Sequence, residues 1–147
     1  MKRLFVAALL YAMVTLIHGP ALSEGALAPR NIVVSYDRGG NLVDYARYVS
    51  SLQRQDVIVR IAGTCDSACT LFLSLPANKA CVYPGATFGF HRAHGASQTA
   101  NNWGTDYMMR SYPYWVRQWI YASGGLSSRI KRMDYRYAAQ FVPTCRA

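Results

Sequence analysis

The fold is decided by the stretch Gly63-Thr-Cys-Asp-Ser67-Ala-Cys-Thr70, together with Phe88-Gly-Phe-His91, whose histidine follows the serine by twenty-four residues. Apolar residues precede and follow the first stretch, so its serine falls where a strand turns into a helix. The second stretch is an apolar strand that ends on a histidine. A hydroxyl at such a turn, with a histidine at the end of the next strand, is the pairing that serine acyl transfer requires.

Predicted strands alternate with predicted helices around these two stretches. The apolar runs predict strands at 32–36, 57–61, 81–83 and 87–91, with helices at 42–53 and 67–74. Asn41 can cap the first of these helices, and the tight turn Asp37-Arg-Gly-Gly40 comes just before it. Strands that alternate with helices imply right-handed crossovers. The predicted fold is therefore α/β with a mostly parallel sheet.

The second half of the chain is expected to contain a polar loop and an aromatic helix. Residues 92–106 are rich in Gly, Ser, Thr and Asn, and residues 105–122 carry a stripe of Tyr and Trp. Pro113 should kink or split this helix, and residues 126–133 are expected to form a short final helix. A stripe of aromatic side chains at helical spacing predicts either a core face or a contact between copies of the chain.

The N-terminus resembles an export signal. Lys2-Arg3 precedes an apolar run at 4–17, which Gly19-Pro20 and the small residues of Ala21-Leu-Ser23 follow. This order predicts a cleaved signal peptide at 1–23. The alternative is a membrane anchor, but the run is short for a span that needs about 20 residues. We therefore expect a periplasmic or secreted protein whose residues 24–147 form a single domain.

Four cysteines occur, and all of them follow the predicted signal. Export and an even number favour two disulfides, for which three connectivities exist. The preferred pairing is Cys65–Cys69 across the turn at Ser67, with Cys81–Cys145 holding the C-terminus. A zinc site at Cys65 and Cys69 is the rival interpretation, but no histidine lies at a matching spacing near Cys81 or Cys145. No metal or other cofactor is expected.

The charge of the chain is strongly positive. The formal net charge is +9, and removing Lys2 and Arg3 leaves +7. Such a surface favours anionic partners such as the envelope of the cell, although it also suits a solvated surface with no specific ligand. Nucleic acid is not an expected partner of an exported protein, and the arginines are scattered along the chain.

Taken together, Asp37-Arg-Gly-Gly40, Gly63-x-x-x-Ser67-Ala and Phe88-Gly-Phe-His91 resemble the Clp protease proteolytic subunit of the Clp/crotonase superfamily. The exported Clp-like proteins with a Cys-x-Ser-Ala-Cys motif are more similar still. The likeness covers residues 32–94, and residues 105–142 more loosely. It implies a superhelix of β-β-α units. It also implies that Ser67 is the nucleophile, that His91 is the base, and that the oxyanion hole is built from the N–H groups of Gly39 or Gly40 and of Ala68.

The chain departs from this family in several ways. The third catalytic residue of the family is an aspartate that follows the long helix, and Asp134 falls several residues early for that role. Asp106 is the other acid of this region, and His94 is an alternative base. Neither Lys79 nor Lys131 sits at a motif that would support a serine–lysine dyad. The domain is also shortened at both ends relative to a complete family member.

Two functions are therefore predicted. The first is an exported serine hydrolase, a peptidase that acts on a peptide or protein substrate through an acyl-enzyme at Ser67. The second is an inactive Clp-like domain that binds or supports components of the cell envelope. The family forms rings and stacked trimers, and this resemblance implies a homo-oligomer that contacts its copies through the aromatic helix at 105–122.

Overall fold

The structure is a computed structural model that describes residues 29–146. The predicted signal peptide at 1–23 lies outside the described residues. In chain order the elements are β1 (Arg30–Asp37), α1 (Leu42–Gln53), β2 (Val57–Asp66), the 3-10 helix η1 (Ser67–Ser74), β3 (Ala80–Val82), β4 (Thr87–Phe90), α2 (Gln98–Ser111), α3 (Tyr114–Ala122), β5 (Lys131–Asp134) and α4 (Tyr135–Ala138). Among the helices of residues 29–146, none combines the length and apolar character that crossing a membrane requires.

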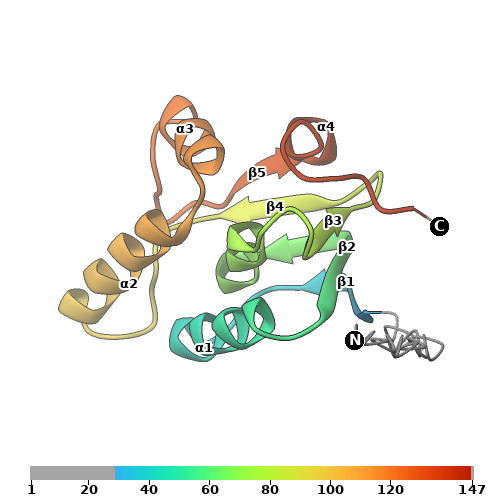
Figure 1. Ribbon diagram of the computed structural model, residues 1–147. Coiled ribbons are helices and arrows are strands. Elements are labelled where there is room, and N and C mark those ends of the chain that lie inside the picture. The colour runs from blue at the N-terminus through green and yellow to red at the C-terminus, as the bar shows by residue number, and fades with distance from the viewer. Residues whose placement is uncertain (1–28, 147) are drawn as a thin grey trace, which may run out of the picture.

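The strands form one mixed sheet in the order β1-β2-β4-β5 (Figure 1). β1 is parallel to β2, and both β3 and β4 are parallel to β2 along its other edge. The last strand, β5, is antiparallel to β4. The prediction of an α/β fold with a mostly parallel sheet is confirmed at this level.

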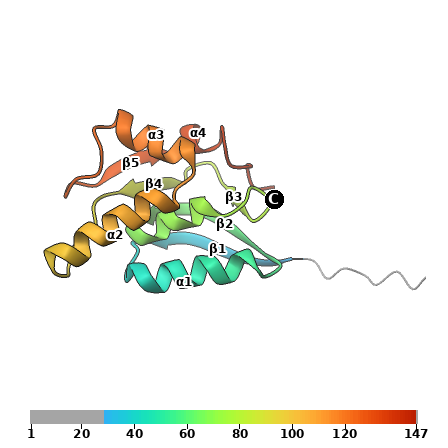
Figure 2. The same ribbon diagram turned by 60° about the vertical axis from the view of Figure 1, so that its left-hand side comes forward.

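One face of the sheet is covered by α1, η1 and α2 (Figure 2). Alternate residues of β2 and β4 point into this layer, and the side chains of Val59, Ile61, Phe88 and Phe90 are fully buried there. On β1 the other face carries Val33 and Tyr36, which are 61% and 69% exposed. The alternation of a half-buried strand thus decides which side of the sheet holds the core.

The predicted elements of the first half of the chain are present in the structure, although β2 runs to Asp66, beyond its predicted end at residue 61. α1 ends at Gln53 as expected, and the side chain of Asn41 caps it by accepting hydrogen bonds from the amides of Val43 and Asp44. The predicted split at Pro113 is also confirmed, because α2 ends just before this proline and α3 begins just after it.

The second half differs from the prediction at two places. Residues 126–133 were expected to be a helix, but this is wrong, because Lys131–Asp134 pairs with β4 as strand β5. α2 begins at Gln98, inside the predicted loop, where the Ser97 hydroxyl accepts a hydrogen bond from the amide of Ala100. In both segments polar residues interrupt the regular spacing of apolar residues from which helices and strands were predicted.

The aromatic stripe at 105–122 is partly buried. Tyr112, Val116 and Ile120 are buried. Trp115 stacks on Phe141, with ring centroids 4.8 Å apart, so the C-terminal segment covers part of the stripe. Tyr114 and Tyr121 remain exposed, and a contact between copies of the chain stays a prediction.

Two disulfides cross-link the chain. They join Cys65 to Cys69 and Cys81 to Cys145, which is the preferred pairing. The second bond spans 64 residues, and beside it the amide of Cys145 donates a hydrogen bond to the carbonyl of Val82. Cross-linking such distant residues restricts the unfolded chain. Paired cysteines indicate an oxidising environment outside the cytosol.

Candidate active site

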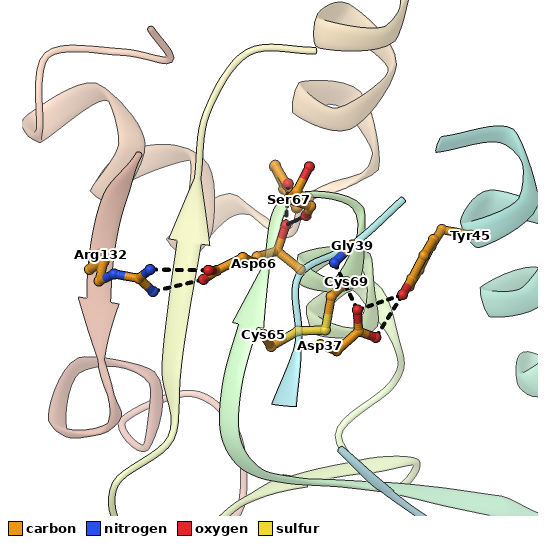
Figure 3. The surroundings of a disulfide bond; sticks show 10 residues. Asp37, Gly39, Tyr45, Cys65, Asp66, Ser67, Cys69 and Arg132 are labelled. Carbon is orange, nitrogen blue, oxygen red and sulfur yellow. Dashed lines mark hydrogen bonds and ion pairs between the residues drawn. A yellow bond between two sulfur atoms is a disulfide. The ribbon is translucent and has the colours of Figure 1, made fainter. Parts of the chain in front are cut away.

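Ser67 sits on a strained turn between β2 and η1. Its φ is +58°, and it is the one residue other than glycine with a positive φ among residues 29–146. Such a conformation costs about 1–3 kcal/mol and persists only where the surroundings impose it. Here the Cys65–Cys69 disulfide holds both sides of the turn (Figure 3). A sharp strand-to-helix turn of this kind projects a serine hydroxyl away from the backbone.

The Gly39-Gly40 turn is positioned by the carboxylate of Asp37. This carboxylate accepts hydrogen bonds from the amide of Gly39 at 2.7 Å and from the hydroxyl of Tyr45 at 2.6 Å (Figure 3). Burial raises the pKa of Tyr45, and the hydrogen bond to Asp37 raises it further. Because the Gly39 amide is already engaged, it is not free to bind a substrate oxygen.

The glycine turn presses directly against the turn at Ser67. A Cβ atom on Gly39 would lie 2.7 Å from the amide nitrogen of Ala68 and 2.8 Å from the Cβ of Ser67. Gly39 also has a φ of +77°, a conformation that side chains disfavour. Within residues 29–146 the amides of Gly40 and Ala68 have no hydrogen-bond partner. Both amides are free donors at this contact.

His91 reaches the same place because β2 and β4 are parallel neighbours. Their C-terminal ends lie at one edge of the sheet, and Asp66 pairs with Gly89 there. The Nδ1 atom of His91 lies 2.8 Å from the carbonyl oxygen of Arg92. We assign Nδ1 as the donor, since a carbonyl can only accept. The Nε2 atom is then free to accept a proton.

The segment after β4 is held by two further hydrogen bonds. The amide of Arg92 donates to the carbonyl of Ser127, and the amide of Ala93 donates to the hydroxyl of Thr105. These bonds fix the direction of the carbonyl to which His91 is bound. The ring of His94 lies beside that of His91, with centroids 5.2 Å apart.

One cavity of about 650 Å³ brings the predicted residues together. Its lining includes every residue predicted for nucleophile, base and oxyanion hole, and also the alternative base: Gly39, Gly40, Ser67, Ala68, His91 and His94. In the described part of the chain, no hydrogen bond joins the hydroxyl of Ser67 to the ring of His91. The cavity therefore brings Ser67 and His91 to one place without a hydrogen bond between them.

The structure does not bring Asp134 to this cavity. β5 is antiparallel to β4, so Lys131 pairs with Phe90 beside His91, whereas Asp134 pairs with Thr87 at the far end of β4. The carboxylate of Asp134 instead caps α4 by accepting a hydrogen bond from the amide of Tyr137 at 2.9 Å. Asp106 and Lys79 do not line the cavity either.

An ion pair that was not predicted lies beside the serine. Asp66 is only 5% exposed, and its two carboxylate oxygens accept hydrogen bonds from the guanidinium of Arg132 at 2.8 and 3.1 Å. The pair crosses β4 at Gly89 (Figure 3), where a Cβ atom would lie 2.2 Å from the Asp66 carboxylate. The sequence feature that could have indicated this pair is Gly89, which stands between two phenylalanines.

A second contact that was not predicted supports the turn at Ser67. The hydroxyl of Thr70 donates to the carbonyl of Ser67 at 2.6 Å, so the hydroxyl of Tyr112, also 2.6 Å away, donates to Thr70. Tyr112 is fully buried, and this burial raises its pKa. The chain from Tyr112 through Thr70 thus fixes the backbone of the candidate nucleophile.

Replacing Arg132 by glutamine should lower stability by about 2 kcal/mol. The change leaves the buried Asp66 carboxylate without its cation, and half of the Arg132 side chain is exposed, so solvent offsets part of the loss. Urea unfolding followed by circular dichroism measures this change. Arg136→Gln is the matched control, since no ion pair within residues 29–146 includes Arg136. Equal unfolding midpoints for the two variants would contradict the assignment.

Residues 29–146 contain no group of three or more His, Cys, Asp or Glu side chains that could hold a metal ion.

No family model matches the sequence, and no curated protein matches it. Solved structures do match. One is an enzyme of unspecified activity, with 10% identity over 78% of this chain and 76% of that one, at a TM-score of 0.53. A peptidase from Plasmodium falciparum has the same identity and coverage at a TM-score of 0.49. At this identity the first likeness shows a shared fold alone.

Proposed function

We propose that this protein is an exported serine hydrolase, a peptidase of the Clp/crotonase superfamily that acts outside the cytosol. The observation that carries the proposal is the strained turn at Ser67, which shares one cavity with His91 and with the free amides of Gly40 and Ala68. The order and spacing of the three motifs support the superfamily. The two disulfides support an oxidising compartment.

The proposed reaction begins when the Ser67 hydroxyl attacks the carbonyl carbon of a peptide bond and its proton passes to Nε2 of His91. The amides of Gly40 and Ala68 donate hydrogen bonds to the oxyanion that forms. Collapse of this intermediate breaks the C–N bond, and His91 returns the proton to the leaving amine. A water molecule, activated by His91, then hydrolyses the acyl-enzyme.

The carbonyl of Arg92 takes the place of a carboxylate in this scheme. It holds the tautomer of His91 in which Nε2 accepts the proton. A neutral carbonyl stabilises the imidazolium less than a carboxylate does, so we expect slower turnover than a full triad gives. The missing bond between Ser67 and His91 does not oppose the scheme, since such bonds often form only when substrate is present.

A non-catalytic binding domain is the second candidate. It is favoured by one observation, namely that no carboxylate of the described residues is hydrogen-bonded to His91. In that case Ser67 only begins η1, and the disulfide beside it only supports the turn.

Labelling with a fluorophosphonate probe tests the hydrolase. The oxidised protein should be labelled, and Ser67→Ala should abolish labelling because the probe bonds to the nucleophile. His91→Ala should slow labelling by about 100-fold or more, in line with the loss of a general base.

The matched control is Ser128→Ala, which removes an exposed hydroxyl and should label at the rate of the unmodified protein. His94→Ala, which removes the neighbouring imidazole, should label faster than His91→Ala. If the oxidised, folded protein is not labelled, or if labelling survives in Ser67→Ala, the hydrolase is excluded and the binding domain is favoured.

A further inference from the structure

A second hollow continues the candidate active site between α1 and α2. It measures about 400 Å³ and shares Leu42, Val43 and Trp103 with the larger cavity, so the two hollows adjoin. We call this second hollow the α1–α2 groove; its remaining lining residues are Ala46, Arg47, Ser50, Arg54 and Tyr107. Its side chains come from both helices, and they differ in kind along the groove.

The end shared with the active site is apolar and aromatic. Val43 is 42% exposed and Trp103 is 52% exposed. The ring of Trp103 stacks on that of Tyr107, with centroids 5.4 Å apart and planes 20° from parallel. The indole of Trp103 is held in place by the ring of Tyr107, but half of it is open to solvent. It therefore offers a preformed surface on which a planar or aliphatic group can pack.

The other end of the α1–α2 groove is cationic. Arg54 has no partner for its guanidinium within residues 29–146. Arg47 has one exposed neighbour, Asp44, at 3.8 Å, and such a contact contributes little. No acidic side chain lines the groove. The one acid of the larger cavity, Asp66, is already paired with Arg132.

We propose that the α1–α2 groove binds an acidic segment of a peptide substrate. An apolar side chain of the peptide packs on Trp103, and the carboxylate of a neighbouring glutamate or aspartate lies between Arg47 and Arg54. This extends the proposed function by naming the substrate class. A peptide fits better than a membrane because the groove adjoins the cavity at Ser67, so a chain that lies across both would place a peptide bond near the serine.

Peptide binding is measured by fluorescence anisotropy with the full chain carrying Ser67→Ala, so that no turnover interferes. The probes are labelled hexapeptides that alternate phenylalanine with glutamate, glutamine or lysine. The glutamate peptide should bind roughly tenfold more tightly than the glutamine peptide, because two guanidinium groups face its carboxylates. The lysine peptide should bind most weakly, and added salt should reduce the difference.

Matched variants locate the effect. Arg47→Gln with Arg54→Gln should remove most of the preference for glutamate, whereas Arg136→Gln, on the distant helix α4, should retain it. Trp103→Ala should weaken the glutamate and glutamine peptides by similar factors, since it removes the apolar contact that they share. A preference for glutamate that survives in the double variant would overturn the proposal.

Vesicles that contain phosphatidylglycerol distinguish a membrane from a peptide. Binding to these vesicles that depends on Arg47 and Arg54, with equal affinity for the three peptides, would overturn the proposal in favour of a lipid surface. The outcome is independent of the labelling experiment: a glutamate preference without labelling at Ser67 would retain the groove as a peptide site and reject the hydrolase.

Discussion

The Gly63→Ala variant is expected to lose more than about 3 kcal/mol of stability. A Cβ atom at this position would lie 2.0 Å from the carbonyl oxygen of Ser35, which belongs to the backbone of the neighbouring strand. The register between β1 and β2 shifts between Val34 and Tyr36, which brings the two strands together beside Gly63. A backbone atom cannot rotate away as a side chain can, so the sheet itself would have to open.

Thermal unfolding and urea unfolding, both followed by far-ultraviolet circular dichroism, measure this loss. Gly85→Ala is the control, because Gly85 has a φ of +94° but nothing lies within 4 Å of the added Cβ. It should cost only the backbone strain of a positive φ, about 1–2 kcal/mol. If Gly63→Ala were no less stable than Gly85→Ala, the close approach of β1 and β2 would be refuted.

The Gly39→Ala variant should fold but lose its reaction with fluorophosphonate by about 100-fold. The added methyl group would meet the Ala68 amide at 2.7 Å, and the φ of +77° adds backbone strain. The glycine turn is expected to move away from Ser67, because this movement relieves both the steric contact and the backbone strain. The movement would separate the amides of Gly40 and Ala68. Loss of one oxyanion donor costs roughly 100- to 1000-fold in known enzymes.

Gly125→Ala is the matched control for this variant. Gly125 has a similar φ of +74°, but nothing lies within 4 Å of the added Cβ, and the residue does not line the cavity at Ser67. It should react at a rate close to that of the unmodified protein. The labelling rate and the melting temperature are measured for both variants. Equal labelling rates would show that the glycine turn has no part in the reaction.

Local patterns predicted much of the first half of the fold. Asn41 before an amphipathic run identified the start of α1, and the apolar runs identified the parallel strands. β5 was missed because its polar residues alternate around a single buried side chain, Met133. Its identity as a strand comes from the free edge of β4, to which it pairs. A partner strand is information that a local window does not contain.

The same contrast between local motifs and distant partners applies to the candidate site. Ser67, His91 and the glycine turn could be singled out because each belongs to a short motif at a strand end, and the structure places all of them around one cavity. Arg132 was not found, since its partner Asp66 lies 66 residues away and the pair forms only where β4 carries a glycine. Asp134 fitted the family by sequence distance alone, and the antiparallel direction of β5 carries it away from His91.

The Cys65–Cys69 bond has a practical consequence for how the protein is produced. Both cysteines are fully buried and flank the strained turn, so the bond has to form while the chain folds. A sample expressed in a reducing cytosol would present Ser67 on an unclamped backbone. Labelling experiments therefore require protein in which this disulfide is formed.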